Sequence, residues 1–188
     1  MPDDDPQPPA DAPDDAPADA PADVPDDAPE GALGVDDVLH HASLLPDVVV
    51  ETVAEGSDAP AAAWGDSFVT YDPDGTADRS RWQPFATVVT SDYPGFDESS
   101  RLDRPGVFRV NLGVGRELFV ELLGYPPAAA AEHAGEVDPA TSDVWLPHPA
   151  YAAQGWVAVV RPGARTGERL RRLLEQTHAR AAARYRRG

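Results

Sequence analysis

The stretch FATVVTSDYPGFDESSRLDRPGVFRVNLGVG, residues 85–115, decides the fold. It contains two segments typical of β-strands, 85–90 and 107–114, joined by a loop crowded with acids, arginines and serines. Apolar side chains occupy alternate positions of the second segment: Phe108, Val110, Leu112 and Val114. Because alternate side chains of a strand point to opposite faces, we expect Arg109 and Asn111 to share the other face.

Upstream of this stretch, the sequence predicts one helix and two further strands. Apolar residues recur at helical spacing over 34–45, and the helix is stopped before Pro46. Residues 48–54 are rich in β-branched side chains, and 64–71 form a second strand-like segment. The turn sequence Asp-Pro-Asp-Gly at 72–75 closes the latter.

Downstream, a helix is predicted over 116–123, with Gly124 as its cap. Residues 126–143 form a connector with no packing pattern, and 144–151 lead to a last strand at 156–160. A long helix follows from Thr166, its N-cap, to about residue 185.

The order of elements is helix, four strands, helix, strand, helix. This order predicts an α+β fold rather than the regular βαβ alternation of a doubly wound sheet. We expect a mainly antiparallel sheet of about five strands, packed by an N-terminal helix, a middle helix and a long C-terminal helix.

Charge is distributed unevenly along the 188 residues. The chain has 33 acidic and 15 basic side chains, and every basic residue is arginine. Residues 1–30 hold eleven of the acids, nine prolines and no base, which leaves a net charge of −7 for the rest. Such a composition cannot bury enough apolar surface to offset chain entropy. We therefore predict a disordered acidic Pro/Ala/Asp-rich tail over 1–33 and a single domain over 34–188.

Several classes of protein are disfavoured by composition. The absence of cysteine excludes disulfides, thiolate metal sites and cysteine nucleophiles. No apolar run is long enough for a membrane span, and no signal peptide is evident, so a cytoplasmic location is expected. No phosphate-binding loop, dinucleotide fingerprint or metal motif occurs, and we expect neither a cofactor nor a metal. The absence of lysine, with abundant Ala, Pro, Asp and Gly, indicates a high-GC source genome.

The C-terminal helix is rich in arginine, with nine arginines against two glutamates over 161–188. The acidic charge of the remaining chain opposes approach to a polyanion, so no specific nucleic-acid partner is expected. The acidic tail has two interpretations. It is a solubilising segment, or it is an acidic arm that occupies the arginine-rich end of the same chain.

The first candidate site is a polar pocket formed by 92–111 and the loop 148–151. Guanidinium groups can bind a carboxylate or phosphate in a bidentate pair, so an anionic small molecule or acidic peptide is the expected partner. The candidate binding residues are Arg101, Arg104, Arg109, Asn111, Asp103, Tyr151, Trp64 and Asp66. The alternative is that the arginines pair with Asp97, Asp103 and their neighbours and so fix the loop.

The second candidate is a metal-independent, hydrolase-like site. His148 lies between two prolines and could act as a general base, with Ser100 or an aspartate such as Asp66 or Asp103 beside it. No nucleophile elbow surrounds Ser100. A third possibility is a purely structural or protein-interaction role, which is favoured if the arginines are salt-bridged and no cavity exists.

Four segments carry a resemblance to a known family: AWGDSFVTYDPDG (63–75), residues 83–115, HPAYAAQGWVAVV (148–160) and LLEQTHARAAARY (173–185). These resemble an uncharacterised actinobacterial family, domain of unknown function 6194, over about 35–188. The resemblance implies no activity. The closing strand and helix are similar, in pattern only, to MmcQ/YjbR-type domains with a CyaY-like fold.

Overall fold

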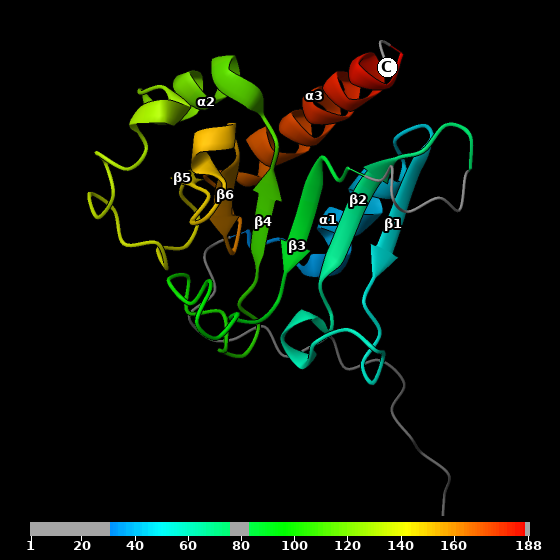
Figure 1. Ribbon diagram of the computed structural model, residues 1–188, viewed down its shortest axis with the longest axis horizontal. Coiled ribbons are helices and arrows are strands. Elements are labelled where there is room, and N and C mark those ends of the chain that lie inside the picture. Colours follow the sequence, from blue (N-terminus) through cyan, green and yellow to red (C-terminus); the bar gives the residue numbers. More distant parts are fainter. Residues whose placement is uncertain (1–30, 76–82, 187–188) are drawn as a thin grey trace, which may run out of the picture.

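The structure is a computed structural model of the 188-residue chain, and it describes residues 31–75 and 83–186 (Figure 1). The predicted disorder of residues 1–30 lies outside the described residues. None of the helices within these two ranges combines the length and apolar character needed to cross a bilayer.

A six-stranded sheet in the order β1-β2-β3-β4-β6-β5 forms the centre of the domain, and every neighbouring pair of strands is antiparallel. The strands are β1 (Val48–Thr52), β2 (Ser67–Tyr71), β3 (Ala86–Val89), β4 (Arg109–Leu112), β5 (Leu146–Pro147) and β6 (Val157–Val160). The α+β prediction is confirmed. The sixth strand, β5, was not predicted, because it is two residues long and contains a proline, which a sheet accepts at an edge.

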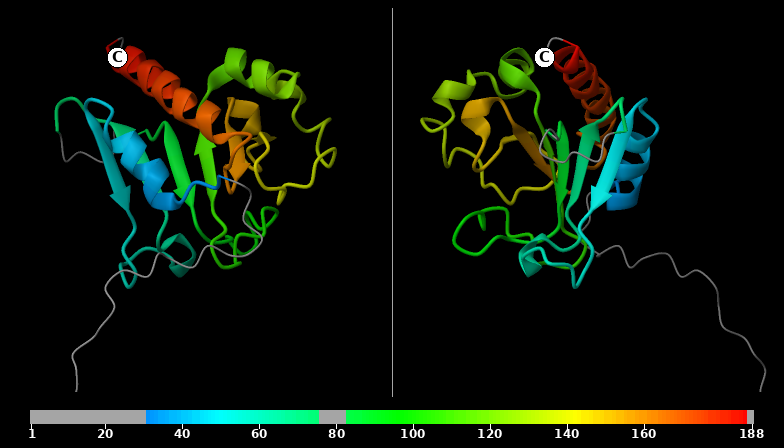
Figure 2. Two further views of the ribbon diagram at one scale, coloured as in Figure 1. Left: turned by 180° about the vertical axis from the view of Figure 1, so that it is seen from behind. Right: turned by 45° about the vertical axis from the view of Figure 1, so that its right-hand side comes forward.

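Three α-helices accompany the sheet: α1 (Val35–Ser43), α2 (Gly115–Leu123) and α3 (Gly167–Tyr185). Seen from behind, α1 and α3 lie across the same face of the sheet, while α2 lies beyond the end of β4 (Figure 2). Short 3-10 helices occur at η1 (Ala61–Ala63), η3 (Pro127–Ala129) and η4 (Ala152–Gln154). The other face of the sheet is therefore left for the long loops between strands.

The main core lies between the sheet and α3. Val88, Val110 and Leu112 of the sheet are at most 1% exposed, as are Leu170 and Leu173 of α3. Each such side chain contributes about 1.5–3 kcal/mol by its removal from water. Since Val110 and Leu112 face this core, Arg109 and Asn111 lie on the opposite face, as their alternation predicts.

Two glycines hold η4 against the start of α2. The amide of Gly115 donates a hydrogen bond to the carbonyl of Gly155 at 2.9 Å. A Cβ at Gly155 would lie 2.8 Å from the Cα of Gly115, and the φ of Gly155 is +80°. Only glycine permits this close approach without strain.

The connector over 126–143 differs from its prediction. It was expected to be exposed and without packing, but Pro127, Ala130 and Ala140 within it are buried. Small Ala and Pro side chains give no periodic pattern, so their burial depends on the helices and strands that they meet. The connector passes from α2 to β5 and forms one wall of a pocket described below.

Candidate functional site

A buried ion pair joins the loop after β3 to β4. Arg109 of β4 donates from Nη2 to Oδ2 of Asp97 at 2.6 Å and from Nη1 to Oδ1 at 3.2 Å. The two side chains are only 3% and 4% exposed. Two parallel bonds of this kind fix the orientation as well as the distance of the partners.

The remaining bonds of Arg109 extend this pair into a network. Its Nε donates to Oδ1 of Asn111 at 2.9 Å, and Nη1 also donates to Oγ of Ser100 at 2.8 Å. Asn111 in turn donates to Oγ1 of Thr87 on β3 at 3.0 Å. Four N–H groups of the guanidinium are thereby bound within the protein, out of five that an arginine has. This arrangement matches the alternative in which Arg109 fixes the loop.

Arg101 and Arg104 lie at the exposed side of the same loop. Arg101 pairs with Asp138 of the connector at 2.5 Å, where both side chains are more than half exposed. Arg104 donates to the backbone carbonyls of Arg101 at 2.6 Å and Ser100 at 3.4 Å. Asp103 accepts a hydrogen bond from the amide of Asp92 at 2.9 Å. Each of these polar groups therefore binds another part of the loop or the connector.

Asp66 forms a second buried polar cluster at the start of β2. Its carboxylate accepts hydrogen bonds from the Tyr93 hydroxyl at 2.5 Å and the Thr90 amide at 2.8 Å. Burial raises the pKa of Asp66, although the bonds from Tyr93 and Thr90 oppose that shift. Burial and the neighbouring Asp66 also raise the pKa of Tyr93. Trp64, two residues earlier, donates from its indole to the carbonyl of Ala59 at 3.1 Å.

His148 is buried, with 6% of its surface exposed, and its ring is oriented by the backbone. Nδ1 accepts hydrogen bonds from the amides of Ala150 at 3.1 Å and Tyr151 at 3.3 Å. The neutral ring must therefore hold its proton on Nε2. Burial, assisted by the positive charge of Arg109, lowers the pKa of His148 to about 4. Near neutral pH, Nε2 is thus an N–H donor.

This tautomer bears on the hydrolytic hypothesis. A base that takes a proton from Ser100 through Nε2 would need the other tautomer, which would break both backbone bonds to Nδ1. Within residues 31–75 and 83–186, no hydrogen bond joins His148 to Ser100; the Ser100 hydroxyl instead accepts a bond from Arg109. The geometry therefore favours His148 as a donor to a ligand.

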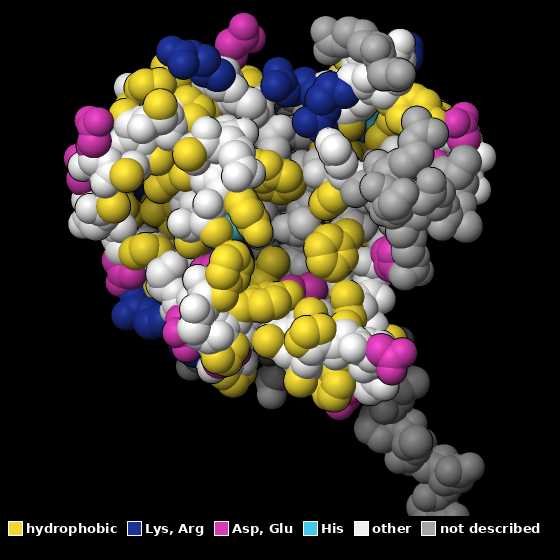
Figure 3. Space-filling model, in the orientation of Figure 1, with side chains coloured by type: hydrophobic (Ala, Val, Ile, Leu, Met, Phe, Trp, Pro, Cys, Tyr) yellow, Lys and Arg dark blue, Asp and Glu magenta, His cyan; other side chains and the backbone are white. Residues whose placement is uncertain are grey.

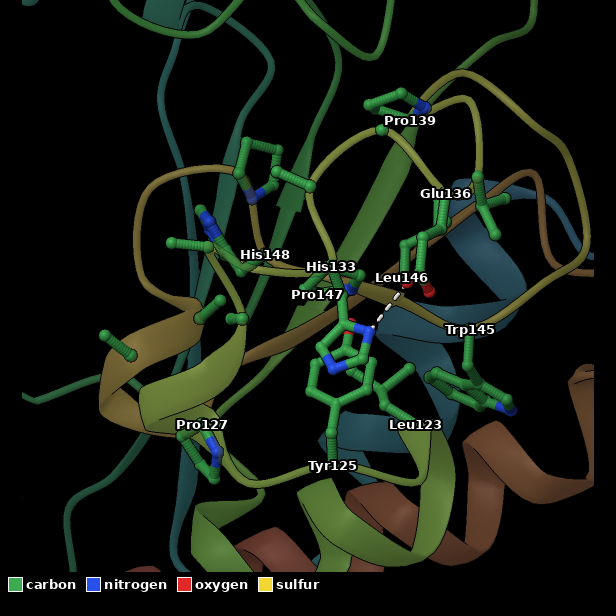
Figure 4. Close-up of a pocket in the computed structure, with 18 of the residues that line it drawn as sticks. Leu123, Tyr125, Pro127, His133, Glu136, Pro139, Trp145, Leu146, Pro147 and His148 are labelled. Carbon is green, nitrogen blue, oxygen red and sulfur yellow. Dashed lines mark hydrogen bonds and ion pairs between the residues drawn. The ribbon is translucent and has the colours of Figure 1, made fainter.

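His148 lines a pocket of about 640 Å³ between α2, the connector and the segment from β5 to η4. Figure 4 places His148 and Trp145 at opposite ends of this pocket, with Tyr125 and His133 between them. The rings of Tyr125 and His133 are stacked, 3.8 Å apart and 9° from parallel, and Nδ1 of His133 lies 2.9 Å from Glu136. Leucine, proline and alanine side chains complete most of the lining: Leu122, Leu123, Pro127, Ala130, Leu146 and Pro147.

The residues predicted from the sequence are distributed over several places. His148 lines the pocket, and Ser99 lines it in place of Ser100. Tyr151 contacts the His148 ring, with ring centroids 4.9 Å apart, and is 42% exposed. Seven of the predicted residues lie in the loop network, on the sheet or beside Asp66, outside this lining: Trp64, Asp66, Arg101, Asp103, Arg104, Arg109 and Asn111.

Sequence reasoning missed the aromatic residues of the pocket. Tyr125, His133 and Trp145 belong to the end of α2 and to the connector, which had been interpreted as exposed. The available signal was the sequence VWLPHPAY at 144–151, where prolines separate Trp145, His148 and Tyr151.

Metal ligands and known relatives give no further assignment. Within the described ranges, no group of three or more His, Asp or Glu could hold a metal ion. No curated protein and no solved structure matches the chain. The likeness to MmcQ/YjbR-type domains and the actinobacterial source therefore stay predictions. Residues 33–188 match the model of one family, described as "Family of unknown function (DUF6194)".

Proposed function

Because the chain belongs to the DUF6194 family, whose function is unknown, its role must be argued from the site, and we propose that it is a small-molecule binding module. The observation that carries this proposal is the pocket of about 640 Å³ with His148 at one end. A volume of this size lies within the range of about 300–1,000 Å³ that is usual for ligand sites.

The walls favour a ligand with a flat apolar body. The Tyr125–His133 stack and Trp145 offer aromatic surfaces, and the remaining lining is mostly leucine, proline and alanine. Aromatic pairs contribute about 0.5–1.5 kcal/mol beyond their buried area, so a ring on the ligand would be favoured over an aliphatic chain of similar size.

The polar end of the pocket favours a hydrogen-bond acceptor on the ligand. The Nε2–H group of His148 has no hydrogen-bond partner among the described residues, while Nδ1 is occupied twice. A carbonyl or carboxylate oxygen would complete its bonding. The proposed ligand class is therefore an aromatic acid or the corresponding amide.

The sequence-based expectation of an anionic ligand held by arginines has less support. Arg109 is bound to Asp97, and Arg101 is bound to Asp138. An anion at these groups would have to compete with carboxylates already in place. The comparison of acid with amide ligands tests whether negative charge contributes to binding.

The experiment is a thermal-shift screen of the full chain against paired aromatic acids and amides, such as 2-naphthoate and 2-naphthamide. Ligands that bind only the folded state stabilise it by about 2.7 kcal/mol at a concentration of 100 Kd. We expect stabilisation that rises with concentration and a shift of the Trp145 indole signal in NMR spectra. Melting temperatures that are flat across the series would overturn the proposal.

His148→Asn provides the matched test of the polar end. An Asn carbonyl can replace Nδ1 as the acceptor for the Ala150 and Tyr151 amides, but nothing replaces the Nε2–H donor. We expect affinity to fall about fivefold to tenfold, since one hydrogen bond contributes about 1 kcal/mol, or somewhat more to a charged acceptor. Recovery of the ligand unchanged after incubation distinguishes binding from hydrolysis involving Ser100.

A further inference from the structure

A row of arginines runs along one side of α3. Positions that follow one another at intervals of three or four residues lie on the same side of a helix. Gln176 and five arginines have this spacing: Arg165, just before the helix, and Arg169, Arg172, Arg180 and Arg184 within it. Figure 3 shows arginine side chains gathered at the edge of the molecule formed by α2 and α3.

Only part of this arginine row is neutralised by the domain. Arg169 pairs with Glu121 of α2, and Arg172 pairs with Glu168. Arg165, Arg180 and Arg184 are exposed and form no ion pair with any residue of the described ranges. The row therefore keeps a net positive charge that faces solvent.

The N-terminal end of the described chain lies beside the first arginine of the row. The Leu33 amide donates to the Pro162 carbonyl at 2.8 Å. A Cβ on Gly31 would lie 3.6 Å from the Cβ of Ala164, and the Leu33 side chain meets Gly167 at the start of α3. The chain that precedes Gly31 consequently emerges next to Arg165.

The preceding segment has the opposite charge and sufficient length. Residues 1–30 contain eleven acids and no base. At about 3.3 Å per residue, an extended chain of this length reaches roughly 100 Å. The nineteen residues of α3 span about 28 Å at 1.5 Å each. Only the first part of the segment is needed to follow the whole arginine row.

We infer that the acidic segment 1–30 docks on the arginine row of α3 in the same molecule and shields it from other polyanions. Attachment at Gly31 gives the segment a high effective concentration at the row, so weak individual ion pairs suffice. Acids near Arg165 also gain from the positive end of the helix dipole. Because the contact is mainly electrostatic, salt must release it.

The absence of cysteine allows a direct test on the full chain. A nitroxide attached to Ala18→Cys broadens NMR signals of nearby amides. We expect the amides of α3 from Arg165 to Arg184 to lose at least half of their intensity at about 50 mM NaCl. At about 500 mM they should recover, because the screening length falls from roughly 14 Å to 4 Å. Broadening spread evenly over the domain, or unchanged by salt, would overturn the inference.

A neutral segment provides the control. With every Asp of residues 1–30 changed to Asn, and Glu30→Gln, the α3 signals should keep their intensity and retention of the chain on heparin at low salt should increase. Equal broadening with and without the acids would show that charge does not direct the segment. A mixture of spin-labelled unlabelled-isotope chain with ¹⁵N chain lacking the nitroxide tests for contact between copies. Broadening in this mixture as strong as within one molecule would contradict docking within the chain.

Discussion

At the scale of single residues, Arg109 determines the position of the loop between β3 and β4. It joins Asp97 and Ser100 of the loop to Asn111 of the sheet. Removing one partner of a buried ion pair leaves an uncompensated charge and costs about 3–5 kcal/mol. We predict that Asp97→Ala lowers the free energy of unfolding by that amount, as measured by urea denaturation.

Arg101→Ala is the matched control for this prediction. Its ion pair with Asp138 is more than half exposed on both sides. Pairs of this kind contribute about 0–1 kcal/mol. If Asp97→Ala were no more harmful than Arg101→Ala, Arg109 would not be what holds the loop.

His148 makes a second prediction, on the dependence of stability on pH. Its pKa is about 4 in the folded chain, against about 6.5 in an unfolded one. Between these values the unfolded state takes up a proton that the folded state does not, so stability falls as pH falls. The loss should approach about 3 kcal/mol near pH 4.

The measurement compares the full chain with His148→Asn at about pH 7 and pH 4.5. The raised pKa of Asp66 acts in the opposite direction, but it is common to both chains and cancels in the difference. A stability difference between the two chains that does not change with pH would show that His148 does not titrate as described.

At the scale of elements, Asp143 fixes the start of α3. Its carboxylate accepts bonds from the amides of Gly163, Arg165 and Thr166 and from the Thr166 hydroxyl, at 2.6–3.0 Å. Burial disfavours the charge, yet these hydrogen bonds outweigh burial and lower the pKa of Asp143. Thr166 was predicted as the N-cap, but its hydroxyl bonds to Asp143 rather than to the helix.

We predict that Asp143→Ala destabilises the fold by about 2–4 kcal/mol, because it leaves several buried donors without an acceptor. Thr166→Ala removes only one of the four bonds and should cost about 1 kcal/mol. Both values are measurable by denaturation, and a larger loss for Thr166→Ala would reverse the assigned roles.

At the scale of the whole molecule, some features could be predicted from the sequence and others could not. Alternation over 107–114 correctly placed Arg109 and Asn111 on one face, because that inference uses only neighbouring residues. The partner of Arg109 lies twelve residues away in a loop with several acids, so the choice of Asp97 required the folded chain. The pocket was missed because its wall of alanines and prolines has no periodic pattern.

The most direct test of the central claim is to fill the pocket and titrate with 2-naphthoate and 2-naphthamide. Ala134 is exposed and lines the pocket, so Ala134→Trp places an indole at the site; Ala179→Trp adds the same group to an exposed position of α3 outside the lining. We predict that Ala134→Trp weakens binding at least tenfold, about 1.4 kcal/mol, while Ala179→Trp binds like the unchanged chain. Equal affinity in all three chains would contradict a ligand site in this pocket.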